Sequence, residues 1–299
     1  MEKVAINIGF SCNNNCIFCI DKNKRSLKQP CLEDLKRRVD MAAKRNCEEL
    51  YIVGGEPLIS KYFFSLLDFA KTRGIKKMGA ETNGRMLCYE DFVKKIKKYE
   101  PIKFTVSFHF PNAFLYKKYC LADGFYQSVA GIKNLIKYKI DFGINTLIMK
   151  PNLLYLEDVI NFLKKMGVNK PIYLIHIDGK NIMDKYKEFV PKFSECIDVV
   201  QKIIKKNPNI KVQGIPPCIF KEDLRENVVS CFNYSKKPLI LTKQIPESDY
   251  EKERQGQFQT YKKYFVSPSY CKKCRNRSTC LGIRKDYFKI YGAKELKPI

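Results

Sequence analysis

The chain has 299 residues, 45% of them hydrophobic, which is enough for one large domain or for one domain with an appendage. No apolar run approaches the roughly 18 residues that a membrane-spanning helix needs. The N-terminus has neither the apolar region nor the cleavage site of a secretory signal. We therefore expect a cytoplasmic protein whose 13 cysteines are metal ligands, catalytic thiols or core residues rather than disulfides.

The net charge of +25, from 56 Lys and Arg against 31 Asp and Glu, suits a polyanionic partner such as RNA. The lysines are dispersed along helical segments, however, and are not gathered in one block. Solvated helix faces in a Lys-rich chain are therefore the favoured interpretation, and RNA binding stays an alternative.

Short β-rich runs alternate with amphipathic helical runs over the first 206 residues. We predict strands at residues 4–9, 49–54, 76–82, 102–110, 141–149 and 171–177. We predict helices at residues 32–45, 62–74, 91–99, 128–139, 156–167 and 193–206. Six successive βα units imply parallel strands with right-handed crossovers, so we expect an α/β fold, a partial barrel of six βα units. Its functional residues should lie at the carboxyl ends of the strands.

The pattern changes after Lys206. Segments become short, Pro216 and Pro217 follow each other, and residues 246–259 are strongly polar. We therefore expect a barrel domain at residues 1–206 and a smaller C-terminal domain at residues 207–299.

Three cysteines, Cys12, Cys16 and Cys19, fall in the loop after the first predicted strand. A cubane [4Fe–4S] cluster normally takes four thiolates, so three would leave one iron open to a substrate or cofactor. A zinc site completed by a distant ligand, or a set of core cysteines, is the alternative.

The spacing Cys12-x3-Cys16-x2-Cys19, with Phe18 before the last cysteine, resembles the cluster-binding signature of the radical S-adenosylmethionine (SAM) enzymes. The segment VGGEP at residues 53–57, after the second strand, resembles the GGEP motif of that family. The segment ETNG at residues 81–84 ends the third strand, where the family often carries TNG. Ser107 and Asn145, in the fourth and fifth strands, match polar positions that often contact SAM. The resemblance covers about residues 1–206.

The resemblance implies a site and a reaction. The open iron would chelate SAM, and reductive cleavage would release a 5′-deoxyadenosyl radical that abstracts a substrate hydrogen. The implied cluster ligands are Cys12, Cys16 and Cys19. The implied SAM-binding residues are Phe18, Gly54, Gly55, Glu56, Asn83, Ser107 and Asn145. An electron donor such as flavodoxin or ferredoxin would be needed.

A second cysteine group, Cys271-x2-Cys274-x5-Cys280, lies near the C-terminus, and Cys218 lies upstream. By itself this group suggests zinc as readily as iron–sulfur. After such a barrel it resembles the SPASM and twitch extensions, although no cysteine follows Cys280 to complete the SPASM pattern. The resemblance implies one auxiliary [4Fe–4S] cluster held by all four, with Cys231 competing for the place of Cys218. Zinc stays the alternative.

Both histidines fall near the ends of predicted strands, His109 on the fourth and His176 on the sixth. Asp178 shares that edge. We expect these residues at the barrel mouth, in substrate binding or proton transfer, with a structural histidine as the alternative. Cys88 and Cys120, expected in loops, are weaker candidates for a hydrogen-donating thiol.

The resemblance implies a radical SAM oxidoreductase that oxidises or cross-links its substrate with help from the auxiliary cluster. A peptide or protein is the favoured substrate, and RNA or a small molecule is the alternative. Because the first strand begins by Val4, we expect no peptide-recognition domain before the barrel. A non-enzymatic zinc-binding or RNA-binding protein is a remote alternative. The GGEP segment argues against it, because such a protein has no need of this motif.

Overall fold

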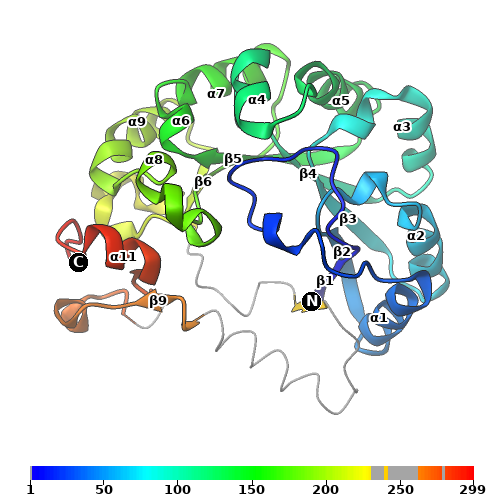
Figure 1. The fold of residues 1–299 in the computed structure, drawn as a ribbon, viewed down its shortest axis with the longest axis horizontal. Helices are drawn as coiled ribbons and strands as arrows, with labels where there is room; N and C mark the ends of the chain where they lie inside the picture. Colours follow the sequence, from blue (N-terminus) through cyan, green and yellow to red (C-terminus); the bar gives the residue numbers. More distant parts are fainter. Residues whose placement is uncertain (1, 230–238, 242–261, 278–279) are drawn as a thin grey trace.

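A curved parallel sheet is the framework of the protein (Figure 1). The computed structural model describes residues 2–229, 239–241, 262–277 and 280–299. The strand order is β7-β6-β5-β4-β3-β2-β1-β8, and every pairing in the sheet is parallel. The strands are β1 (Glu2–Asn7), β2 (Cys47–Val53), β3 (Lys77–Thr82), β4 (Ile102–Ser107), β5 (Asp141–Ile148), β6 (Ile172–His176), β7 (Lys211–Gln213) and β8 (Leu239–Leu241).

One long helix follows each of the first six strands and covers the outer side of the curved sheet (Figure 1). These helices are α1 (Leu32–Lys44), α2 (Phe63–Thr72), α3 (Glu90–Lys97), α5 (Phe125–Lys137), α7 (Leu156–Lys165) and α9 (Phe193–Lys206). The predicted α/β partial barrel of six βα units is therefore confirmed. The additional helices α4 (Ala113–Cys120), α6 (Lys150–Leu153) and α8 (Tyr186–Phe189) were not predicted.

The sheet also extends beyond the six predicted strands. The boundary expected at residue 206 falls between α9 and β7, and β7 still pairs with β6. At the opposite edge, β8 pairs with β1. Residues from the predicted C-terminal domain thus complete both edges of the barrel sheet.

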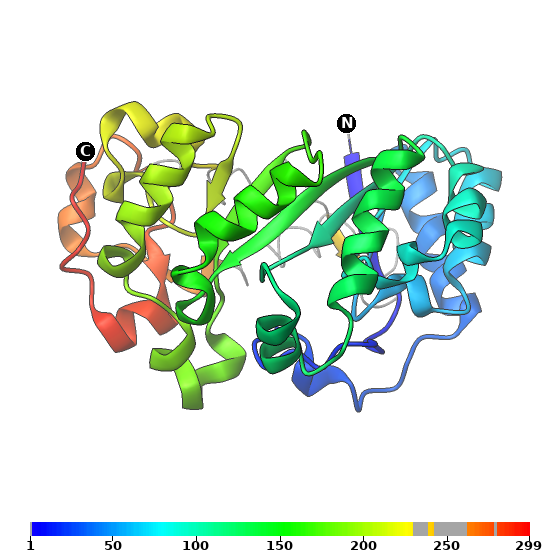
Figure 2. The same ribbon diagram turned by 90° about the horizontal axis from the view of Figure 1, so that it is seen from above.

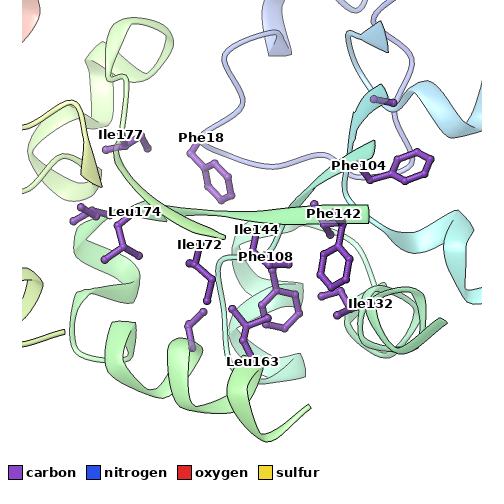
Figure 3. Packing of buried hydrophobic residues seen from close by; sticks show 14 of the residues in the cluster. Phe18, Phe104, Phe108, Ile132, Phe142, Ile144, Leu163, Ile172, Leu174 and Ile177 are labelled. Atoms are coloured by element: carbon purple, nitrogen blue, oxygen red, sulfur yellow. The ribbon is translucent and has the colours of Figure 1, made fainter. Parts of the chain in front are cut away.

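The core lies between the sheet and its helices (Figure 3). Along β5, Ile144 and Ile148 are buried toward the helices, whereas Asn145 is only half-buried. Successive side chains of a strand point to opposite faces, so Asn145 lies on the inner, concave face. This alternation brings polar side chains to the inside of the barrel while the other face buries its apolar residues.

The C-terminal part packs against the β6 end of the barrel (Figure 2). It contains the antiparallel strands β9 (Phe265–Val266) and β10 (Ile283–Arg284) and the helix α11 (Lys285–Tyr291). The Tyr287 ring stacks on Phe193 with centroids 4.1 Å apart, and its hydroxyl accepts a hydrogen bond from the Phe193 amide at 2.8 Å. Within the described ranges, no helix is long and apolar enough to cross a membrane.

Candidate active site

The loop after β1 carries Cys12, Cys16 and Cys19 and rests directly on the loop after β2. The amide of Gly55 donates to the carbonyl of Gly9 at 2.9 Å, and the amide of Glu56 donates to Ser11 at 2.8 Å. A Cβ at Gly55 would collide with the carbonyl oxygens of Phe10 and Ser11. Glycine is therefore required at this position for the close approach of two backbones.

The far side of the cysteine loop is held by the end of α4. The amide of Asn15 donates to the carbonyl of Cys120 at 2.9 Å, and the amide of Ile17 donates to Tyr119 at 3.0 Å. The buried Asn14 side chain donates to the Tyr116 hydroxyl at 2.8 Å. The loop is thus fixed on both sides, by β2 and by α4.

Backbone amides point at two of the three thiols. The amide of Asn14 donates to Sγ of Cys12 and the amide of Asp21 donates to Sγ of Cys19, each at 3.4 Å. Burial nevertheless raises the pKa of Cys12 to about 11, and it raises the pKa of Cys19 as well. Binding of a metal centre would therefore release the protons of these thiols, as is usual for cysteine ligands.

The donor set of the cysteine loop fits an iron–sulfur cluster. Such clusters are held by cysteine thiolates, and a cubane [4Fe–4S] cluster takes one thiolate on each iron. Three thiols on one loop would therefore hold three irons and leave one iron not bound by the protein.

Asn83 and Arg85, at the end of β3, tie this strand to the cysteine loop. Nδ2 of Asn83 donates to Oδ1 of Asn13 at 2.7 Å and lies 3.9 Å from Sγ of Cys12. The Arg85 guanidinium donates to the Asn13 carbonyl and, at 2.9 Å, to Oδ1 of Asn14. Sequence reasoning missed Arg85, whose only signal was its place directly after the TNG segment.

Glu56 clamps the ends of β2 and β3 together. Its Oε1 accepts from the Leu58 amide at 3.1 Å and from the Thr82 hydroxyl at 2.7 Å, and its Oε2 accepts from the Asn83 amide at 2.7 Å. The residue is 2% exposed, and burial raises its pKa to about 7 despite these donors. A direct contact between Glu56 and the SAM ammonium stays a prediction.

Ser107 and Asn145 are paired in register on β4 and β5 and are both half-buried. Neither side chain has a hydrogen-bonding partner within the described part of the chain, so both are available to a ligand. They lie on the concave face, Ser107 on the strand next to β3 and Asn145 one strand further from it.

Phe18 and His109 are brought together beside the cysteine loop. Their rings meet edge to face with centroids 5.4 Å apart. Nδ1 of His109 accepts from the Leu147 amide at 3.2 Å, which places the proton of the neutral ring on Nε2. Burial lowers the pKa of His109 to about 4, so the ring is neutral at physiological pH.

His176 and Asp178 lie apart from this group. Nε2 of His176 lies 3.0 Å from the carbonyl oxygen of Pro191, and its ring contacts the stacked pair of Phe193 and Tyr287. Burial lowers its pKa to about 4. Asp178 pairs with Arg284, so it joins the barrel to the C-terminal part. The expected place of His176 at the barrel mouth is corrected: it shares the helix-facing side of β6 with Ile172 and Leu174.

The second cysteine group lines one cavity. Cys218, Cys271, Cys274 and Cys280 all border it, together with Pro216, Pro217 and the C-terminal residues 296, 298 and 299. The Gly282 amide donates to Sγ of Cys280 at 3.4 Å, and burial raises the pKa of Cys218. The competing ligand, Cys231, lies outside the described residues.

A model of the radical SAM superfamily matches residues 6–163, more than half of the chain. The chain belongs to the radical SAM superfamily. Enzymes of this superfamily use a [4Fe–4S] cluster and SAM, so the predicted family and these two cofactors are confirmed.

Relatives with assigned activities share about a quarter of their aligned residues with this chain. The chain is 25% identical over 214 residues to a probable GTP 3′,8-cyclase of Sulfurisphaera tokodaii. The match covers 69% of this chain and spans 64% of the length of that relative.

Solved structures of similar fold extend over nearly the whole chain. Streptococcus suis SuiB bound to precursor peptide SuiA matches with a TM-score of 0.68 at 15% identity, over 99% of this chain and 74% of that one. Native anSMEcpe with bound AdoMet matches with a TM-score of 0.68 at 16% identity, over 100% and 93%. At these identities the likeness establishes the fold alone.

A substitution of Gly55 tests the contact between the two loops. Gly55→Ala should push the cysteine loop away and disrupt two backbone hydrogen bonds, each worth about 1 kcal/mol. We expect SAM affinity to fall about tenfold or more, since about 1.4 kcal/mol is tenfold. Equilibrium binding of SAM to the anaerobically reconstituted protein measures it.

The matched control is Gly74→Asn, since nothing lies within 4 Å of a Cβ at Gly74 and Asn accepts its positive φ of 78°. Affinity of the Gly55→Ala protein within twofold of wild type would contradict the assigned role of this contact.

Proposed function

We propose that the protein is a radical SAM oxidoreductase that oxidises or cross-links a peptide or protein, with an auxiliary [4Fe–4S] cluster in its C-terminal part. The observation that carries the proposal is the cysteine loop, whose backbone is held between the loop after β2 and helix α4. Ser107 and Asn145, whose side chains have no partner in the described part of the chain, lie in register on β4 and β5. The cavity lined by four further thiols supports the auxiliary site.

The residues at the strand ends have distinct roles in this proposal. Cys12, Cys16 and Cys19 hold the first cluster, and the backbone at Gly54 and Gly55 lets SAM approach it. Asn83, Ser107 and Asn145 bind polar groups of SAM, with Phe18 as an apolar wall. When bound, the first cluster and SAM would supply a 5′-deoxyadenosyl radical for hydrogen abstraction, and the auxiliary cluster would supply a one-electron acceptor.

His109 is the proposed substrate-facing histidine. Its neutral ring, with the proton on Nε2, lies against Phe18 of the cysteine loop. It can donate one hydrogen bond and is uncharged above about pH 4, so it suits orientation of a polar substrate group. We assign no part in catalysis to His176 or Asp178, because both bind the C-terminal part to the barrel.

The C-terminal cavity favours iron–sulfur over zinc. Four thiols border this cavity, as an auxiliary cluster needs, and together with the barrel's family they support iron–sulfur. Four thiolates also suit tetrahedral zinc, which stays the alternative. Ligation by all four would leave no open iron for substrate, so the proposed task of the auxiliary cluster is electron transfer.

The proposed substrate class is supported by a solved structure of similar fold. SuiB, whose fold matches over 99% of the chain, is known bound to a precursor peptide. The probable GTP 3′,8-cyclases favour a small molecule as the second candidate. RNA as a substrate is considered only as one outcome of the deuterium-transfer experiment below. We also propose a cytoplasmic setting with a flavodoxin- or ferredoxin-type donor, whose docking a net charge of +25 would favour if the donor is acidic.

Metal content tests the two cluster sites. After anaerobic reconstitution we expect about eight irons per chain, since each cubane holds four. Replacing Cys12, Cys16 and Cys19 together with Ala should leave about four. A matched triple variant at Cys31, Cys47 and Cys196, which lie outside both sites, should keep about eight. Iron, acid-labile sulfide and zinc are measured on each protein.

About four irons in the wild type, with zinc retained when the first three cysteines are replaced, would contradict the auxiliary cluster. The late cysteines would then form a zinc clasp, and the proposed oxidation through a second cluster would lose its basis.

Deuterium transfer tests the substrate class. An extract of cells grown on deuterated medium is separated by size into macromolecules and small molecules, and each fraction is given to the reconstituted enzyme with SAM and a reductant. We expect deuterium in 5′-deoxyadenosine with the macromolecular fraction, abolished by protease and kept after ribonuclease.

Label from the small-molecule fraction, or from deuterated GTP alone, would replace the peptide by the second candidate. Label lost on ribonuclease treatment and kept after protease would point to RNA instead.

A further inference from the structure

The chain directly after Cys19 forms an exposed, positively charged stretch, which we call the basic segment and define as residues 20–28. Figure 2 shows this part of the chain, in blue, at the lower margin of the molecule. Seven of its nine residues are exposed and none is buried, so its side chains face solvent. One carboxylate, that of Asp21, stands against four cations, which are Lys22, Lys24, Arg25 and Lys28.

The basic segment begins with backbone bonds to the third cysteine. The amide of Asp21 donates to Sγ of Cys19 at 3.4 Å, and the amide of Lys22 donates to the Cys19 carbonyl at 3.3 Å. The Leu27 amide donates to the carbonyl of Lys24 at 3.0 Å, so the segment folds back in tight turns. Its exposed cations are therefore held close to the Cys19 thiol.

Two further bonds hold the segment in place. Nη1 of Arg25 donates to Oδ1 of Asn15 at 3.0 Å, and the Asn181 side chain donates to the Ile20 carbonyl. The Asn15 amide donates in turn to the carbonyl of Cys120, which is the buried last residue of α4, so the loop position expected for Cys120 is corrected. The segment thus has a defined surface that a partner meets in one orientation.

The surface of the segment combines charge with apolar contact area. The side chains of Ile20 and Leu27 are 57% and 53% exposed. Those of Lys22 and Lys28 make no bond within the described part of the chain, and that of Lys24 stays 50% exposed although it pairs with Asp21. Apolar contacts bordered by charged groups are typical of protein–protein interfaces. Single-stranded RNA is bound through aromatic rings that stack on its bases, and residues 20–28 include none.

We propose that the basic segment is the docking surface for an acidic one-electron donor protein of the flavodoxin or ferredoxin kind, which reduces the SAM-binding cluster beside Cys19. The inference rests on the proposed function in one respect, the ligation of iron by Cys19. One electron leaves the reduced donor, which is thereby oxidised, and enters the cluster, which is thereby reduced.

The physical reason is distance combined with charge. Electron transfer slows steeply with distance, so the donor has to dock close to the cluster it reduces. The basic segment starts one residue after a proposed ligand, and its cations attract an acidic surface and speed the encounter. Contacts between electron-transfer proteins are small and short-lived, so a surface of this size suits them.

The C-terminal cysteine group has basic neighbours too. Lys272 and Lys273 are exposed and lie between Cys271 and Cys274. A donor that docked there would reach the auxiliary site first, whereas the electron that cleaves SAM is needed at the first cluster. These two lysines are therefore the matched comparison for the basic segment.

The experiment measures the affinity of reconstituted holoenzyme for an oxidised two-cluster ferredoxin of strongly negative net charge, by calorimetry at low salt. An acidic flavodoxin serves as a second probe. The test variant carries Lys22→Glu and Lys28→Glu, and a companion with arginine at both positions keeps the charge.

Two control variants change the same amount of charge elsewhere. One carries Lys272→Glu and Lys273→Glu, beside the C-terminal cysteines. The other carries Lys76→Glu and Lys98→Glu, at exposed positions on the loops that lead into β3 and β4. Iron content is measured on all proteins.

For the Lys22→Glu, Lys28→Glu protein we expect the dissociation constant of the ferredoxin to rise about tenfold. The arginine companion and both controls should stay within about twofold of wild type. Because salt screens exposed charges, the tenfold difference should shrink to about twofold near 0.5 M salt. The rate of cluster reduction by ferredoxin, divided by the rate with photoreduced 5-deazariboflavin, a small uncharged reductant, should fall by the same factor.

Equal affinities of the wild type and the Lys22→Glu, Lys28→Glu protein would overturn the inference, as would a larger loss in the Lys272→Glu, Lys273→Glu protein. Failure of both donor proteins to bind the wild type would overturn it too. A variant that loses affinity for a single-stranded RNA but keeps its affinity for both donors would assign the segment to RNA instead.

Failure of the proposed function gives a different result. It would show as a wild type in which 5-deazariboflavin reduces no cluster that responds to SAM. The affinities for ferredoxin and flavodoxin are measured independently of that reduction, so they still decide where the donor docks.

Discussion

The close contact between the loop after β1 and the loop after β2 is the constraint on which the rest of the site depends. Two amides at Gly55 and Glu56 bond to the carbonyls of Gly9 and Ser11, and only glycine at position 55 leaves room for them. This contact fixes where the cysteine loop leaves the sheet. The positions of all three thiols relative to the polar side chains of β4 and β5 follow from it.

The surroundings of this contact hold the loop in place on both sides. Glu56 joins β2 to β3 through the Thr82 hydroxyl and the Asn83 amide, and Arg85 reaches from the end of β3 to Asn13. On the other side α4 holds the loop at residues 15 and 17. These contacts fix the course of the loop backbone and with it the positions of the three cysteines.

Much of the fold was predictable because six strands and six helices carry strong periodicities. The predicted helix at residues 193–206 has the bounds of α9, since Phe193, Cys196 and Val200 mark its buried face. The strands β7 and β8 have three residues each and are too short to show a period. Helix α4 was missed because its apolar residues define no clear face. His176 was misplaced because the alternation of side chains along β6 was not followed to the last residue of the strand. Arg85 was missed because a single arginine forms no recognisable sequence pattern.

The central claim is that Cys12, Cys16 and Cys19 form the site of reductive SAM cleavage. The most direct measurement is the yield of 5′-deoxyadenosine from SAM under anaerobic reducing conditions, for the wild type and for the variant with all three cysteines replaced by Ala. The account predicts 5′-deoxyadenosine from the wild type and none above background from the variant, even when the variant retains iron in its C-terminal part. Formation of 5′-deoxyadenosine by the variant would contradict the account.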